Sequence, residues 1–400
     1  MTLPRAFRIT TAAAAGLLLL AAAASAASLK LTLLVRADDP RLERSRVERG
    51  YLGHPGGPAG DGLKMALKDA AFELDAAGLD ISLETVAVAS AAAAREAGQR
   101  AQKAGTAALL ADLDPDAILA LTDAVQRPVL NLAAADDRLR EGDCRSNLWH
   151  LAPSERMRSD ALAQALVTRR WKQVLLLTGP GADDAVRGAA AQAALRRYGL
   201  ELVASKPFRL SADPRERDLA NPLLLTGKLD YDAVWVVDSD GEFARGLPYR
   251  TALPRPVVGD AGLAALAWHA QFERYGAPQV SRRFARAAGR QMTGHDWAAW
   301  VAGKALVTAA LAAQSAPRAA RGGALPQAAF EQALAAVSID GSKGLAMSFR
   351  SWDGQLRQPL LLSDGVGVVD SAPVEGVMHP KTALDTLGAD APEKRCKARS

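Results

Sequence analysis

Residues 107–132, AALLADLDPDAILALTDAVQRPVLNL, contain the clearest strand and helix pattern of the chain. Two short apolar runs, 107–111 and 128–132, flank a segment at 115–126 whose apolar residues recur with helical spacing. A strand, a helix and a strand in this order predict a βαβ unit, in which the two strands are parallel. The predicted class is therefore α/β.

The same alternation continues on both sides of this unit. Strands are predicted at 29–36, 79–88, 173–178, 200–208, 231–237 and 256–259, and helices at 60–77, 91–104, 154–170, 183–198, 213–227 and 240–252. A charged, irregular stretch at 138–150 divides the series in two. The pattern predicts two doubly wound lobes, each a parallel sheet covered by helices.

The last third of the chain has a different rhythm. Helices are predicted at 261–275, 279–289, 293–315 and 326–337, with a linker at 315–325, and short strands of an antiparallel meander at 345–352, 358–362 and 366–370. Helices without intervening strands must pack on a sheet already made, so the chain is expected to return to the first lobe.

Residues 1–26 have the pattern of a secretory signal peptide. Arg5 and Arg8 precede a small apolar stretch, and Ala24-Ser25-Ala26 matches a small-residue cleavage site. The alternative, a membrane anchor, needs a longer apolar stretch. We expect a periplasmic protein whose signal is removed near Ala26.

Length and charge narrow the function classes. About 370 mature residues exceed what one core usually holds, which predicts two domains. Loss of Arg5 and Arg8 lowers the formal charge from +5 to +3, and the remaining basic residues are interleaved with acidic ones. A nucleic-acid partner needs a concentrated basic face, which this pattern does not provide.

The two cysteines, Cys144 and Cys396, are candidates for a disulfide because an exported protein meets an oxidising compartment. Two free thiols are the alternative. A metal site is not expected, because the five histidines are scattered without the spacing of metal ligands.

No motif of a catalyst is present. Gly179-Pro180-Gly181 lacks the third glycine and the Lys-Ser/Thr pair of a phosphate loop, and no Gly-x-Ser-x-Gly elbow occurs. We therefore predict no enzyme activity and no cofactor.

Three segments resemble the type I periplasmic binding proteins, particularly those of branched-chain amino acid importers. They are the first helix at 57–66, the crossing segment at 147–154, and the closing hairpin at 344–359 around Trp352-Asp353-Gly354. A narrower resemblance, carried by residues 144–148 and 351–359, is to the binding proteins that accompany PQQ-dependent alcohol dehydrogenase systems.

The resemblance implies the substrate-binding component of an ABC transporter. Such a protein closes on a small polar solute and has an ABC permease of the inner membrane as its partner. It implies a three-crossover hinge, with lobe 1 at 29–150 plus 261–340, lobe 2 at 151–260 plus 341–372, a C-terminal tail at 373–400, and a monomer. A binding protein that signals to a membrane sensor is the alternative.

Ligands of such sheets lie outside the carboxyl ends of the strands, so the cleft between the lobes is the expected site. The predicted ligand-binding residues are Tyr51, Asp112, Asp114, Ala134, Asp136, Asp183, Asp238, Asp240 and Asp260. The amino acid binders of this family hold a carboxylate with hydroxyls where this chain has Asp112, Asp114 and Asp136. Carboxylates there would repel it, which favours a neutral polyol, a cation or a metal-bound species. The alternative role of these three residues is helix capping.

Overall fold

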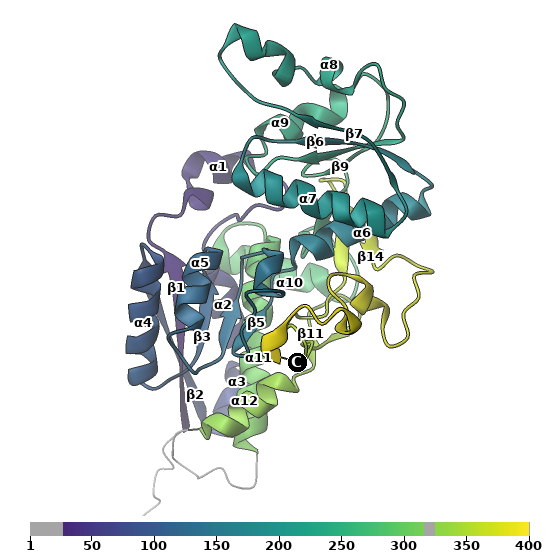
Figure 1. Cartoon of the computed structure of the whole chain (residues 1–400). Helices are drawn as coiled ribbons and strands as arrows, with labels where there is room; N and C mark the ends of the chain where they lie inside the picture. The colour runs from purple at the N-terminus through teal and green to yellow at the C-terminus, as the bar shows by residue number, and fades with distance from the viewer. Residues whose placement is uncertain (1–26, 316–324, 400) are drawn as a thin grey trace, which may run out of the picture.

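The computed structural model describes residues 27–315 and 325–399 (Figure 1). The predicted signal peptide and most of the predicted linker lie outside these ranges.

The first lobe is built on a sheet of five parallel strands in the order β2-β1-β3-β4-β5. The strands are β1 (Ala27–Arg36), β2 (Leu79–Val88), β3 (Thr106–Asp112), β4 (Val129–Asn131) and β5 (Leu148–His150). The helices that follow β1, β2 and β3 are α2 (Gly60–Asp69), α3 (Ala71–Ala77), α4 (Ala91–Lys103) and α5 (Pro115–Thr122). β3 and β4 are buried along their whole length, because α2 packs against one face of the sheet and α4 and α5 against the other.

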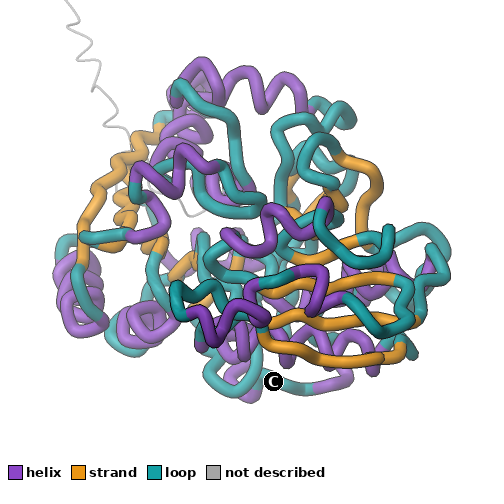
Figure 2. Tube along the Cα trace, turned by 90° about the horizontal axis from the view of Figure 1, so that it is seen from above, coloured by secondary structure: helices purple, strands orange, loops and turns teal. Residues whose placement is uncertain are grey.

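The second lobe repeats this plan with four parallel strands in the order β7-β6-β8-β9. The strands are β6 (Gln173–Thr178), β7 (Glu201–Pro207), β8 (Ala233–Val237) and β9 (Val257–Gly259), and the helices are α6 (Glu155–Thr168), α7 (Ala182–Arg197), α8 (Pro222–Thr226) and α9 (Glu242–Gly246). Figure 2 shows these strands running side by side when the molecule is seen from above. Two parallel, helix-covered sheets confirm the predicted fold class.

After β9 the chain returns to the first lobe, as expected. The helices α10 (Ala277–Ala288), α11 (Gly294–Gln314) and α12 (Gln327–Ala335) share the core of the first sheet. α11 lies very close to α2: a Cβ on Gly62 would be 2.2 Å from the carbonyl oxygen of Asp296. Only glycine at position 62 allows this approach.

Short antiparallel strands complete the fold. β10 (Ala264–Leu266), β13 (Leu360–Ser363) and β14 (Val368–Ala372) form one sheet in that order, and β11 (Ile339–Asp340) pairs with β12 (Ala346–Met347). The predicted helix at 261–275 is therefore wrong, because this apolar segment pairs with β13. The helix predicted at 213–227 is instead the 3-10 helix Pro214–Ala220 followed by α8, because Pro222 starts a new helix. That at 240–252 shortens to α9 and the 3-10 helix Leu247–Tyr249.

Two chain crossings lie side by side at the hinge. The backbone N–H of His150 donates to Gly354 (2.9 Å), and that of Leu356 donates to His150 (2.9 Å). The buried guanidinium of Arg140 joins them, donating to the side chain of Gln355 (2.9 Å) and to the carbonyl of Ala152 (2.9 Å). Burial lowers the pKa of Arg140 to about 10. These buried bonds tie the two crossing segments to each other.

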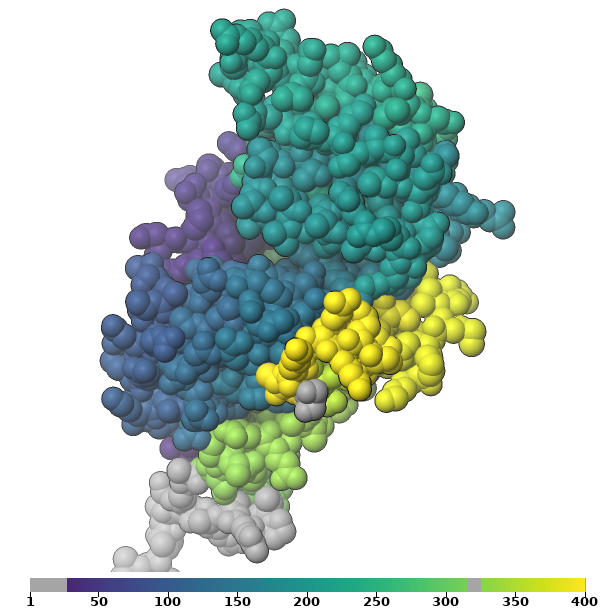
Figure 3. All heavy atoms as spheres, in the orientation of Figure 1, coloured from purple at the N-terminus to yellow at the C-terminus, as the bar shows by residue number. Residues whose placement is uncertain are grey.

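The C-terminal segment 373–399, which we call the strap, is tied to both lobes (Figure 3). Cys396 forms a disulfide with Cys144 of the first lobe, so the predicted pairing is present. On the second lobe, Gln164 donates to the hydroxyl of Thr386 (3.0 Å), and Asp160 accepts the N–H of Gly388 (2.8 Å). The strap therefore spans the hinge.

Candidate ligand-binding site between the lobes

An inserted segment after β1 bridges the two lobes (Figures 1 and 3). It contains the 3-10 helix Pro40–Leu42 and the helix α1 (Arg44–Arg49). Arg46 pairs with Asp240, and the hydroxyl of Tyr51 donates to Glu242, both of which follow β8 in the second lobe. Residues at the carboxyl ends of both sheets thus meet, where the sequence predicted a cleft.

Tyr51 is buried against the turn that opens α9. Gly241 in this turn has a φ of +76°, and a Cβ on it would lie 3.0 Å from the ring of Tyr51. Both the backbone conformation and the close contact favour glycine here. The ring of Tyr51 contacts the opposite lobe. That Tyr51 also contacts a ligand stays a prediction.

Asp112 is buried and already engaged by two side chains of its own lobe. Arg41 of the inserted segment donates to one oxygen (2.6 Å), and His295 at the start of α11 contacts the other (2.9 Å). Burial alone would raise the pKa of the Asp112 carboxyl, but His295 and Arg41 outweigh it and hold this pKa well below its usual value. Because both oxygens of Asp112 are engaged by basic side chains, Asp112 repels an anionic ligand less than an unpaired carboxylate would.

A second ionic network covers the facing edge of lobe 2. Arg187 on α7 donates to Glu155 (3.2 Å) and to Asp260 (2.5 Å), and the other oxygen of Asp260 accepts the N–H of Asp238 (2.6 Å). Burial alone would lower the pKa of Arg187, but the two carboxylates raise it. The carboxylate of Asp238 is occupied by the N–H of Ala244 (2.8 Å). Asp260 and Asp238 thus order the loops after β8 and β9.

The other predicted residues divide into caps and open groups. Asp114 caps α5 by accepting the N–H of Ala117 (2.9 Å), which is the alternative role considered for it. The carbonyl of Ala134 accepts from Arg140 (2.9 Å) and so belongs to the hinge. Within the described ranges, Asp136 of lobe 1 and the exposed Asp183 of lobe 2 form no ion pair.

Asp136 lies among charges of both signs. Burial has the largest effect and raises the pKa of its carboxyl, Arg140 and Arg138 lower this pKa, and the negative charge of Asp183 across the lobes adds a smaller rise. Nearby, Arg158 approaches Glu155 at 3.5 Å, while its Nε is buried without an acceptor among the described residues. Among the described residues, Asp136 and Asp183 thus have no ion pair, and the Nε of Arg158 has no acceptor.

Sequence reasoning missed the basic partners. Arg41, Arg187, His54 and His295 all lie in this region, and three of them reach a carboxylate that is distant in sequence: Arg41 and His295 reach Asp112, and Arg187 reaches Asp260. His54 packs against Tyr51, and burial lowers the pKa of its imidazole. The available signal was the excess of arginine in the inserted segment, opposite loops rich in aspartate.

Comparison with solved structures identifies the architecture. A branched-chain amino acid ABC transporter periplasmic ligand-binding protein from Burkholderia xenovorans superposes with a TM-score of 0.69 at 15% identity, over 93% of this chain and 100% of that one. The fold is that of the type I periplasmic binding proteins. Another protein of this fold, a solute-binding protein from Rhodopseudomonas palustris in complex with benzoate, gives 0.62 at 16% identity, over 85% and 96%.

A periplasmic binding protein from Burkholderia mallei gives a TM-score of 0.66 at 13% identity, over 93% of this chain and 99% of that one. No family model and no curated relative matches the sequence. Over residues 27–315 and 325–399, no helix is long and apolar enough to cross a membrane, and no cluster of three or more acidic, cysteine or histidine side chains is arranged to hold a metal.

Proposed function

We propose that the protein is the substrate-binding component of an ABC transporter, which captures a small polar solute between its lobes and presents its closed form to a permease. The observation that carries this is the meeting of Arg46 and Tyr51 with Asp240 and Glu242 across the two lobes. Contacts of this kind exist only when the lobes are close. A ligand that contacts both lobes can do so only in the same closed state, and it therefore shifts the population toward that state.

The proposal includes export and cellular place. The signal peptide at 1–26 directs the chain to the periplasm, where the disulfide is stable. We keep the lobes as 29–150 plus 261–340 and 151–260 plus 341–372, and we propose a monomer. The narrower resemblance to binding proteins of PQQ-dependent systems supports a role beside alcohol oxidation.

For the ligand we propose a polyol or a small cation. Asp112, Asp240 and Asp260 pair with protein cations, whereas Asp136 and Asp183, from opposite lobes, form no ion pair among the described residues. A ligand that donates hydrogen bonds, or carries a positive charge, has these two carboxylates as acceptors.

The test combines thermal shift with small-angle scattering on the mature chain, against polyols, short alcohols and their acids, amino acids, benzoates, polyamines and metal ions. A ligand at one hundred times its Kd adds about 2.7 kcal/mol to the stability. We expect a hit that also reduces the radius of gyration. The double variant Asp136→Asn/Asp183→Asn should weaken it at least tenfold, whereas Asp80→Asn, at the exposed amino end of β2, should not.

Failure has two distinct forms. A ligand whose affinity is unchanged in Asp136→Asn/Asp183→Asn would overturn the ligand class but leave the function standing. No ligand and no compaction with any compound would overturn the solute-binding function itself. Co-purification of the closed form with a sensor kinase, instead of a permease, would favour the signalling alternative.

A further inference from the structure

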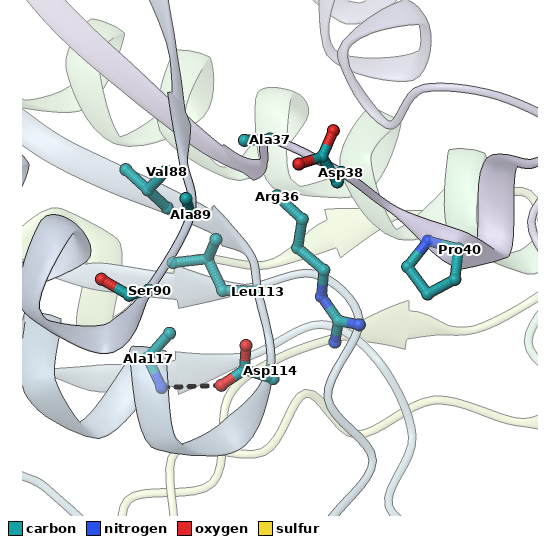
Figure 4. A pocket seen from close by; sticks show the side chains of 10 residues that line it. All are labelled: Arg36, Ala37, Asp38, Pro40, Val88, Ala89, Ser90, Leu113, Asp114 and Ala117. Carbon is teal, nitrogen blue, oxygen red and sulfur yellow. Dashed lines mark hydrogen bonds between the residues drawn. The ribbon is translucent and has the colours of Figure 1, made fainter.

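A cavity lies within the first lobe, at the carboxyl ends of β1, β2 and β3 (Figure 4). Its volume is about 220 Å³. Its walls come from the last residues of β1 and β2, from the start of the inserted segment, and from the turn that opens α5. No residue of lobe 2 lines it, so a molecule bound here is held whether the lobes are open or closed.

Arg36 is the cationic group of this cavity, and it is uncommitted. Its side chain extends through the middle of the view in Figure 4. Its Nε is shielded from solvent and has no acceptor among the described residues. The nearby Arg41, by contrast, is saturated by Asp39 and Asp112. A shielded N–H without an acceptor is unfavourable, and an acceptor from outside the chain would satisfy it.

The helix ends beside the cavity are already capped by the chain. Ser90 accepts the N–H of Ala93 (3.1 Å) at the start of α4, and Asp114 accepts that of Ala117 (2.9 Å) at the start of α5. Affinity for an anion must therefore come from the guanidinium of Arg36. The second oxygen of Asp114 and the exposed carboxylate of Asp38 are acceptors on the same walls.

Apart from Arg36, Asp38, Ser90 and Asp114, the residues that line the cavity are apolar. Val88 and Leu113 form part of the wall between Arg36 and Ser90. The volume lies below the roughly 300–1,000 Å³ of sites for drug-sized ligands, so the occupant has few carbon atoms. The occupant must therefore complement the guanidinium of Arg36, the apolar side chains of Val88 and Leu113, and two carboxylates that accept hydrogen bonds.

We propose that this cavity is an accessory site for a small organic carboxylate that also carries a hydroxyl or amine. The carboxylate pairs with the Arg36 guanidinium in the two-bond geometry that arginine favours. The hydroxyl or amine donates to Asp38 or to the free oxygen of Asp114, and the carbon body contacts Val88 and Leu113. This site is separate from the ligand proposed between the lobes.

The experiment is ligand-observed NMR and calorimetry on the whole mature protein, with lactate, glycerate and serine as probes. Lactamide, which lacks the carboxylate, and propionate, which lacks the donor, are the comparison compounds. We expect lactate and glycerate to bind, lactamide not to bind, and propionate to bind more weakly than lactate. The radius of gyration should not change, because lobe 2 is not involved.

Variants assign the binding to this cavity. Arg36→Ala should weaken lactate at least tenfold, and Arg36→Lys should restore part of it. Arg100→Ala, which removes an exposed arginine at the far end of α4, should leave the affinity unchanged. Absence of binding by all three probes, equal binding of lactamide, or an unchanged affinity in a folded Arg36→Ala would each overturn the proposal. A lactate effect that also compacts the molecule and is lost in Asp136→Asn/Asp183→Asn would place it between the lobes instead, which also overturns it.

Discussion

Replacement of Cys396 by serine releases the strap from lobe 1 while leaving its other contacts in place. The bond joins residues 252 apart. For a closed loop of this length, chain entropy gives an upper value of about 5.5 kcal/mol at 25 °C, and removal of native disulfides usually costs about 2–5 kcal/mol. With an unfolding entropy of roughly 0.8 kcal/mol per kelvin for about 370 residues, the upper value corresponds to a fall in Tm of about 7 °C.

The assay is denaturant unfolding followed by tryptophan fluorescence, on the oxidised wild type and on Cys396→Ser. Cys144→Ser and the double variant are matched controls, because all three remove the same bond and should lose the same free energy. Wild type reduced before unfolding should agree with them. If the free energy of unfolding falls by less than about 1 kcal/mol in every variant, the disulfide adds almost no constraint to the unfolded chain, which contradicts the stabilisation expected here.

Three further changes test other contacts. Tyr51→Phe removes the hydroxyl that reaches Glu242, so we expect a larger radius of gyration without ligand at unchanged Tm; an unchanged radius would show that this bond does not hold the lobes together. Gly241→Ala combines an unfavourable φ with a contact of 3.0 Å, so it should cost about 1–2 kcal/mol, whereas Gly142→Ala, which has nothing within 4 Å, should cost little; equal losses would contradict the packing argument. Burial raises the pKa of Asp160 to about 7, against an unfolded value near 4, so the folded state binds the extra proton and stability falls as pH rises from about 4 to 7. Asp160→Asn should flatten that part of the curve in unfolding measured across this range, and an unaltered slope would rule out Asp160 as its source.

Much of the α/β core was predictable because its elements are long and periodic. β1, β3, α4 and α7 lie within a residue or two of their predicted ranges. The segment at 261–275 was not, because a short apolar run has no period that separates strand from helix, and its pairing with β13 is decided by tertiary contact. The attachment of the strap to lobe 1 through Cys396 was predicted, but its contacts with lobe 2 were not, because its described part has only 3-10 turns and loops, fixed by side chains of distant elements.

The site shows the same division. The loops that meet between the lobes follow from the rule that strands of a parallel sheet end at one edge. The partner of each carboxylate does not follow from it: Arg41 and His295 reach Asp112 from 71 and 183 residues away. Only the folded topology shows that Asp112 is held in ion pairs while Asp136, among the described residues, forms none.

The disulfide also orders events in time. With the export that we propose, the chain emerges from its N-terminus, so Cys144 reaches the oxidising compartment long before Cys396 does. All of lobe 2 and the helices α10, α11 and α12 must cross in between, and Cys144 stays without its proper partner until they have. A molecule that carries the bond therefore has all of the chain between these two cysteines in the oxidising compartment, and its strap is attached to lobe 1.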